Sequence, residues 1–194
     1  MGRAEFLRKL TDALAAAGIR YMITGSVGSA YHGRGRATFD IDIVIDAEPN
    51  QVIAFVESLW EGCYASIQTA LEALKQRTMF NVIDSGQGWK ADLIVRKDRS
   101  FSRMEFDRRQ EARIDGVDVP LVSAEDAILS KLEWAQASQS QRQYEDALGI
   151  AVEQYDRLDR QYLSQWAAEL GVRDELERLL REAKSAQDGG GKTS

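Results

Sequence analysis

The 194-residue sequence predicts an α/β (α+β) fold that ends in a helical region. Helical and strand patterns alternate over residues 1–122, where turn signals at 85–88 and 115–116 each separate two short strands. From residue 123 onward we find only helical periodicity. We therefore expect a core over 1–122 and a helical region over 123–186 packed on it, while the glycine-rich stretch 187–194 predicts a disordered tail.

The first elements follow one another closely. Apolar side chains recur at helical spacing over residues 4–17, and a short apolar run over 19–24 predicts a buried strand. A short helix is expected over 27–31. Residues 40–46 alternate between acidic and apolar side chains, which indicates a strand with two different faces.

The remaining elements are read from the same two periodicities. We expect helices near 48–60, 66–76 and 99–107, and strands over 79–84, 89–95, 110–114 and 117–122. A helix beginning after Ser123 and three more over 144–152, 162–170 and 174–183 complete the chain. The four tryptophans form no spaced stripe, so we expect them in the core.

An Asp-x-Asp pair dominates the chemistry of the sequence. Asp40 and Asp42 are two residues apart on a predicted strand, which places both carboxylates on one face and Ile41 and Ile43 on the other. Two carboxylates so placed repel each other, and a bound divalent cation is the usual compensation. The pair therefore predicts a metal site.

A third carboxylate would complete such a site, and two residues compete for that role. Asp92 lies within an apolar run, where an unpaired carboxylate is costly. Asp84 ends a strand before a turn, a common position for an acid. We favour Asp92, while an ion pair of Asp92 with Lys90 or Arg96 on the sheet surface is the structural alternative.

The residues between the first strand and the two acids are of types that bind phosphate groups. Gly25 and Ser26 offer a close backbone approach, N–H groups at a helix start and one hydroxyl, although Ser26 also fits an ordinary N-cap. Arg34 and Arg36 lie on a glycine-rich loop, and guanidinium groups bind phosphate with two hydrogen bonds. For both arginines a solvated loop charge is the alternative.

These motifs together resemble the nucleotidyltransferase superfamily, whose fold is shared with DNA polymerase beta. The resemblance covers roughly residues 5–150 and rests on Gly25-Ser26, the string Arg36-x-Thr38-x-Asp40-Ile41-Asp42, and a later segment with Ser123, Lys131, Arg142 and Asp146. Within the superfamily the string looks like the branch of AbiEii-type and MenT-type toxins. It implies a mixed sheet flanked by helices.

The resemblance also implies roles for individual residues. Catalysis and the binding of Mg²⁺ or Mn²⁺ would fall to Asp40, Asp42 and Asp92. Nucleotide binding would fall to Gly25, Ser26, Arg36, Lys131 and Asp146. Two alternatives stay open, because Lys131 could instead extend to solvent from an apolar helix face, and Asp146 could pair with Arg142 one turn earlier.

The amino-acid composition argues against several classes of protein. The net charge of −6 argues against a general nucleic-acid coat protein, and a single cysteine excludes an internal disulfide and fits the cytoplasm. No apolar run is long enough to span a membrane. A basic stretch over 96–113 could face an RNA acceptor, although we slightly prefer a solvated surface.

The resulting prediction is a Mg²⁺-dependent nucleotidyltransferase that moves a nucleoside monophosphate from NTP to an acceptor hydroxyl. The branch resemblance makes RNA, in particular a tRNA end, or a protein hydroxyl the expected acceptor, with an antitoxin as a possible partner in a toxin–antitoxin pair. A small-molecule acceptor is the second choice. The rival from another class is a catalytically idle module of the same fold that binds nucleotide, RNA or a partner protein.

Overall fold

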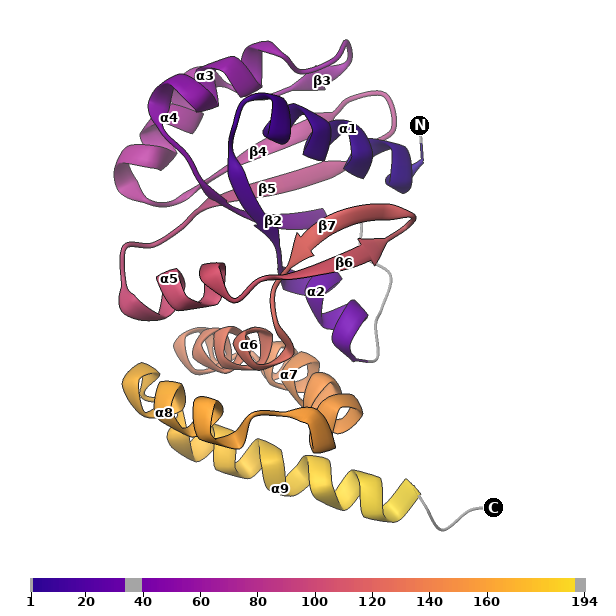
Figure 1. The fold of residues 1–194 in the computed structure, drawn as a ribbon, viewed down its shortest axis with the longest axis vertical. Coiled ribbons are helices and arrows are strands. Elements are labelled where there is room, and N and C mark those ends of the chain that lie inside the picture. Colours follow the sequence, from indigo (N-terminus) through magenta and orange to yellow (C-terminus); the bar gives the residue numbers. More distant parts are fainter. Residues whose placement is uncertain (1, 34–39, 191–194) are drawn as a thin grey trace. The chain divides into compact units, whose positions relative to one another are not determined.

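A computed structural model describes residues 2–33 and 40–190 of the chain (Figure 1). The chain divides into two compact units, one of Met1–Gly25 with Ala37–Val122 and one of Ser26–Arg36 with Ser123–Ser194. The second unit therefore includes a segment near residue 30 that belongs to the core predicted over 1–122. Arg34, Arg36 and Thr38 lie outside the described residues.

Within the described part of the chain, seven strands form one mixed sheet in the order β3-β4-β5-β2-β1-β7-β6. Their bounds are β1 (Arg20–Ile23), β2 (Asp40–Asp46), β3 (Cys63–Tyr64), β4 (Met79–Asp84), β5 (Lys90–Val95), β6 (Gln110–Ile114) and β7 (Val117–Leu121). The pairs β2–β5 and β1–β7 are parallel, and the other neighbours are antiparallel. The α/β fold class predicted from the sequence is confirmed.

The first unit builds its core on one face of this sheet. Alternate residues of the central strands, such as Ile43 and Leu93, are fully buried. The helices α1 (Arg3–Ala16), α3 (Pro49–Glu57) and α4 (Ile67–Gln76) supply buried partners that include Phe6 and Phe55. Each such large apolar side chain contributes about 1.5–3 kcal/mol by leaving water. Helix α5 (Ser100–Asp107) follows β5.

The hairpin predicted at Asp115-Gly116 is confirmed. β6 and β7 pair from Ile114 opposite Val117 onward, and both turn residues have positive φ, 50° at Asp115 and 77° at Gly116. A two-residue turn of this hand matches the twist of the strands, and Asp-Gly is a preferred sequence for it.

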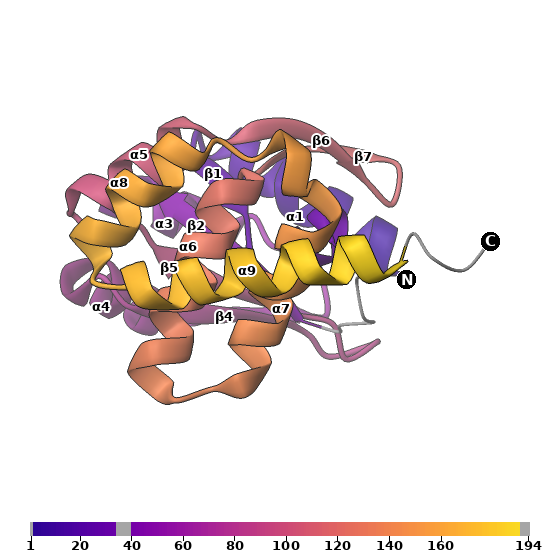
Figure 2. The ribbon, with the colours of Figure 1, turned by 90° about the horizontal axis from the view of Figure 1, so that it is seen from below.

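The second unit is helical. It contains α2 (Gly25–His32, from Ser26 onward), α6 (Ala124–Ser138), α7 (Gln141–Gln154), the short 3₁₀ helix η1 (Tyr155–Arg157), α8 (Arg160–Leu170) and α9 (Arg173–Gly190). Figure 2 shows α9 crossing the neighbouring helices. Ser123 caps α6 and donates to the buried Asp126, which also accepts a hydrogen bond from Tyr162 of α8. This network ties α6 to α8.

The structure corrects three expectations. Helix α9 continues to Gly190, four residues into the expected tail, and Gln187 fixes this end by donating to the carbonyl of Val152. The edge strand β3 was not expected, because two residues are too few to show a periodicity. Trp134, expected in the core, is 60% exposed. Among the described residues no helix has the length and apolarity needed to cross a membrane.

Candidate active site

The acids of the Asp-x-Asp strand face a third acid on the neighbouring strand. β2 and β5 run parallel, and their register sets Asp42 directly opposite Asp92 and Asp40 opposite Lys90. Neighbouring strands lie about 4.8 Å apart, and side chains of paired residues point to the same face. The burial pattern agrees, because Ile41, Ile43 and Leu93 are buried on the other face. The three carboxylates thus share one face of the sheet.

Asp92 is held by two neighbours. Asn81, opposite it on β4, donates a side-chain N–H to Oδ1. The ammonium of Lys90 lies 2.9 Å from Oδ1 and 3.2 Å from Oδ2. The hydrogen bond with Asp92, together with the charges of Asp92, Asp40 and Asp42, raises the pKa of Lys90. Lys90 therefore sits in the electric field of all three carboxylates.

Asp84 occupies the opposite face of the sheet. Its side chain is buried, with 4% of the residue exposed, and its Oδ1 accepts the N–H groups of Gly86 and Gln87 in the turn before β5. These bonds satisfy the carboxylate locally, as is common at turns. Of the two candidates for the third acid, Asp92 is the one that shares a face with Asp42.

Gly25 brings the main chain against the Asp-x-Asp pair. It follows β1, whose neighbour Thr24 donates its N–H to the carbonyl of Asp42. Gly25 has a φ of +62°, and a Cβ built on it would lie 1.9 Å from Oδ2 of Asp42. Only glycine allows this approach, so the sequence signal Gly-Ser reflects a contact with the acid itself.

The other end of the same two strands is neutralised. Asp46, the last residue of β2, forms ion pairs with Arg20 and with Arg96, the latter at 3.1 Å. The side chains of Asp46 and Arg96 are 19% and 15% exposed. At this end of the strands, Arg20 and Arg96 both form ion pairs with Asp46. At the other end, Lys90 lies near three acids.

The donor set fits a hard divalent cation, because Mg²⁺ and Mn²⁺ prefer carboxylate oxygens. Asp40, Asp42 and Asp92 are the residues that could hold it. In the arrangement described, no three His, Cys, Asp or Glu side chains in the described residues converge closely enough to coordinate one ion. The ammonium of Lys90 holds the Asp92 carboxylate instead.

The candidate nucleotide-binding residues of the second unit include a close ion pair. The ammonium of Lys131 lies 2.7 Å from the carboxylate of Asp146, and the two side chains are 9% and 15% exposed. Of the alternatives left open by the sequence, Lys131 therefore does not extend to solvent, and Asp146 is bonded to Lys131 across two helices. Ser26 is half-buried in the first turn of α2.

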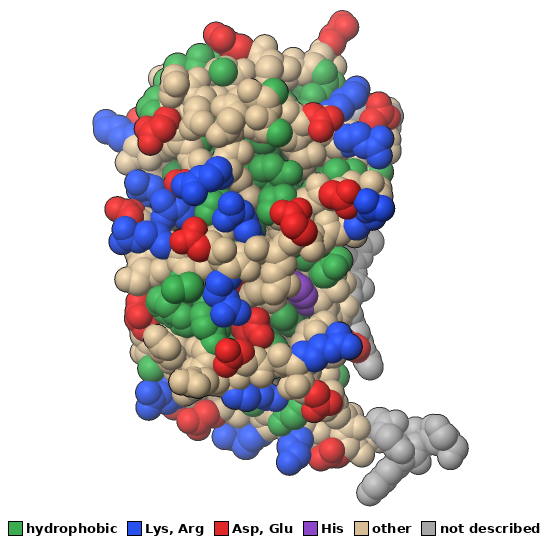
Figure 3. Space-filling view, in the orientation of Figure 1, with side chains coloured by type: hydrophobic (Ala, Val, Ile, Leu, Met, Phe, Trp, Pro, Cys, Tyr) green, Lys and Arg blue, Asp and Glu red, His purple; other side chains and the backbone are tan. Residues whose placement is uncertain are grey.

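The basic stretch over 96–113 is largely paired within the first unit. Arg96 binds Asp46, Arg103 binds Asp98 and Arg113 binds Asp118. Arg109 lies over the ring of Phe106. On the face shown in Figure 3, blue basic and red acidic side chains are interspersed. These pairs favour the interpretation of a solvated surface over a continuous RNA-binding patch.

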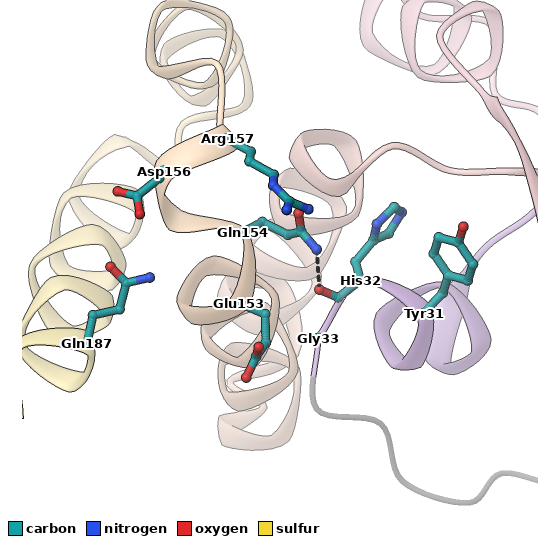
Figure 4. A pocket seen from close by; sticks show the side chains of 8 residues that line it. All are labelled: Tyr31, His32, Gly33, Glu153, Gln154, Asp156, Arg157 and Gln187. Carbon is teal, nitrogen blue, oxygen red and sulfur yellow. Dashed lines mark hydrogen bonds between the residues drawn. The ribbon is translucent and has the colours of Figure 1, made fainter. Parts of the chain in front are cut away.

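A polar cavity of about 460 Å³ lies within the second unit (Figure 4). Its wall includes the buried His32, whose carbonyl accepts a hydrogen bond from Gln154, and it is lined by Tyr31, His32, Gly33, Glu153, Gln154, Asp156, Arg157 and Gln187. None of these residues is a predicted site residue. The only distinctive sequence signal among them is His32, the single histidine of the chain.

Comparison with known proteins supports the fold. No protein-family model matches the sequence, and no curated protein matches it. The solved structures include the antibiotic-resistance factor ANT(2'')-Ia, with a TM-score of 0.53 and 15% identity over 96% of this chain and 94% of that one. An antigenic nucleotidyltransferase-like protein from Paracoccidioides brasiliensis gives 0.53 and 18%, with 91% of each chain covered. The chain therefore has a nucleotidyltransferase-type fold.

Proposed function

We propose that this protein is a nucleotidyltransferase that depends on Mg²⁺ or Mn²⁺ and transfers a nucleoside monophosphate from NTP to an acceptor hydroxyl. The observation that carries the proposal is the register of β2 and β5, which puts Asp42 opposite Asp92. A sheet without a catalytic or binding role gains nothing from three carboxylates on one face, because they repel one another. The fold supports the same activity.

In the proposed reaction the acceptor oxygen attacks the α-phosphorus of the NTP. The bond from the α-phosphorus to the bridging oxygen breaks, pyrophosphate leaves, and Asp92 accepts or directs the proton of the acceptor hydroxyl. Asp40 and Asp42 would hold the metal together with Asp92. The metal, when bound, supplies positive charge to the attacking and leaving oxygens.

The remaining candidates would bind the triphosphate. The main chain at Gly25 and the hydroxyl of Ser26 offer donors at the start of α2. Arg36 and Lys131 would neutralise the phosphate charge, and Asp146 would orient the Lys131 ammonium through their 2.7 Å ion pair.

The acceptor and the biological role are proposed from the sequence string alone. Its resemblance to the AbiEii and MenT toxins favours an RNA end, in particular tRNA, or a protein hydroxyl, and an antitoxin as partner. A small-molecule acceptor is the second choice within the class. One solved ANT(2'')-Ia structure contains adenylyl-2''-tobramycin and has a TM-score of 0.50 to this chain at 16% identity.

The test is incubation with each α-³²P-labelled NTP, Mg²⁺ or Mn²⁺, and either total RNA, cell lysate or an aminoglycoside. We expect label in one acceptor fraction with the wild type and a loss of about 10³-fold or more with Asp92→Asn. Asp84→Asn is the matched control, since Asp84 lies on the opposite face, and it should keep activity if it folds. Nucleotide binding without transfer in any fraction would support the idle module instead.

A further inference from the structure

The acid cluster, meaning Asp40, Asp42 and Asp92, contains a basic side chain of its own. Lys90 lies opposite Asp40 on the neighbouring strand and two residues before Asp92 on its own strand. Its ammonium contacts both oxygens of the Asp92 carboxylate, at 2.9 and 3.2 Å. Lys90 thus brings a positive charge directly onto one of the three acids.

We propose that Lys90 is a resident counter-cation of Asp92 in the acid cluster, which it stabilises in the metal-free protein and which it leaves when a divalent cation binds. The inference rests on the proposed function, because it assumes that these acids bind metal. It assigns to Lys90 a positioning role that neither the sequence motif nor the fold comparison contains.

The contacts of Asp92 explain why the lysine and the metal exclude each other. Asn81 already donates to Oδ1, and Lys90 contacts Oδ1 and Oδ2, so the lysine and a metal ion would compete for the remaining lone pairs of this carboxylate. A divalent cation on the same oxygens would also lie within a few ångströms of the ammonium, and like charges at that distance repel strongly.

A lysine side chain at position 90 is suited to a contact that can form and break. The Lys90 side chain is 36% exposed, against 14% for Asp92, so the ammonium can move into water without crossing the core. Lysine carries a compact charge on a flexible stem, whereas arginine forms planar, two-bond pairs with carboxylates. The strands use arginines at their other end, where Asp46 is closed off by Arg20 and by Arg96, whose side chain is 15% exposed.

The experiment compares Lys90→Met, which keeps the length of the side chain and removes its charge, with the wild type. Without metal, Lys90→Met should melt at a lower temperature, because the Asp92 carboxylate loses the cation that contacts it. Mn²⁺ should bind it about tenfold more tightly, by electron paramagnetic resonance or calorimetry, because the ion no longer displaces a positive charge. Lys90→Gln should show the same increase in affinity, and Lys90→Arg should bind Mn²⁺ no better than the wild type.

Arg96→Met is the matched control, since it removes a cation from the other end of the same strand pair. It should lower the melting temperature and leave Mn²⁺ affinity unchanged. Equal Mn²⁺ affinity in wild type, Lys90→Met and Lys90→Gln would overturn the counter-cation role while leaving the metal site intact. Absence of Mn²⁺ binding in all variants would overturn the metal site and the role of Lys90 together. Loss of NTP affinity with unchanged Mn²⁺ affinity would make Lys90 a phosphate ligand and also contradict the proposal.

Discussion

Asp42 and Asp92 occupy directly opposite positions on two parallel strands, β2 and β5. The pairing joins residues 50 positions apart in the sequence and puts two carboxylates side by side, with Asp40 two residues away on the same face. Like charges so placed oppose folding unless a cation compensates them. Lys90 contacts the Asp92 carboxylate, and the charges of all three acids raise the pKa of Lys90.

Removal of one of these charges should therefore stabilise the metal-free protein or leave it unchanged. We expect Asp42→Asn to melt at the same temperature as the wild type or higher without metal, and to lose the rise in melting temperature that Mg²⁺ or Mn²⁺ gives the wild type. Asp46→Asn is the control on the same strand. It breaks ion pairs with Arg20 and Arg96, so it should lower the melting temperature and keep the metal response. A large loss of metal-free stability in Asp42→Asn would identify a structural ion pair and contradict the metal site.

Gly25→Ala tests the contact between the main chain and the acid. The new Cβ would meet Oδ2 of Asp42 at 1.9 Å in a residue with a φ of +62°. We expect a loss of unfolding free energy of more than about 2 kcal/mol, from backbone strain plus displacement of the carboxylate, and a weaker metal response. Urea unfolding with and without Mn²⁺ measures both quantities.

Gly62→Ala separates the effect of backbone strain from the effect of displacing the Asp42 carboxylate. Gly62 has a φ of +84°, and a Cβ added to it would meet no atom within 4 Å, so it should lose only the backbone contribution of about 1–2 kcal/mol. Its metal response should match that of the wild type. Equal losses in the two variants would mean that the contact with Asp42 has no energetic consequence.

Several features of this fold can be predicted from short stretches of the sequence. The alternation of residues 40–46 gives β2 and its two faces, and Asp115-Gly116 gives the hairpin of β6 and β7. The apolar neighbours of Asp92 favour it over Asp84 as the third acid, which stays a prediction, and the register sets Asp92 opposite Asp42. These features are predictable because each depends on residues close together in the chain.

Other features depend on long-range pairing and have no local signal. The positions of Asn81 and Lys90 around Asp92 follow from the register of three strands. From the sequence, Lys90 is expected only as an alternative surface partner of Asp92. Trp134 is exposed although tryptophan favours the interior, because the buried face of α6 is filled by residues such as Ile128 and Leu132. Residue type alone therefore misplaced it.

The hydroxyl of Tyr144 offers a test of packing in the second unit. It is buried and has no hydrogen-bond partner among the described residues, and burial followed by the charge of Glu182 raises the pKa of Tyr144 to about 12. Tyr144→Phe should be neutral or should stabilise the protein by up to about 1 kcal/mol, because it removes an unsatisfied polar group. Tyr162→Phe should instead cost about 1–3 kcal/mol, since Asp126 loses a donor while buried. Denaturant unfolding of both variants measures the contrast, and a loss of similar size in each would refute it.

The thiol of Cys63 should make the free energy of unfolding depend on pH under alkaline conditions. Burial, followed by the charge of Asp84, raises the pKa of its thiol from 9.0 to about 11. Between pH 9 and 11 the folded state keeps the thiol proton, whereas the unfolded chain loses it. The contribution of this thiol to the free energy of unfolding is therefore complete below pH 9 and is lost as the pH rises through 11. Cys63→Ser should show less loss of unfolding free energy between pH 9 and 11 than the wild type. In addition, iodoacetamide should modify the native thiol at pH 8 more slowly than the thiol in urea. Equal rates would contradict the raised pKa.

Lys131 and Asp146 allow stability and nucleotide binding to be separated. Their ion pair of 2.7 Å is largely buried, so Lys131→Met should cost about 3 kcal/mol of unfolding free energy by leaving the Asp146 charge uncompensated. The double variant Lys131→Met with Asp146→Asn should recover much of that loss, since no unpaired charge remains. If Lys131 binds the triphosphate, both variants should bind NTP with Mg²⁺ at least tenfold more weakly by calorimetry and still bind Mn²⁺ like the wild type. Full NTP affinity in the stable double variant would reduce the pair to a structural role and remove Lys131 from the proposed site.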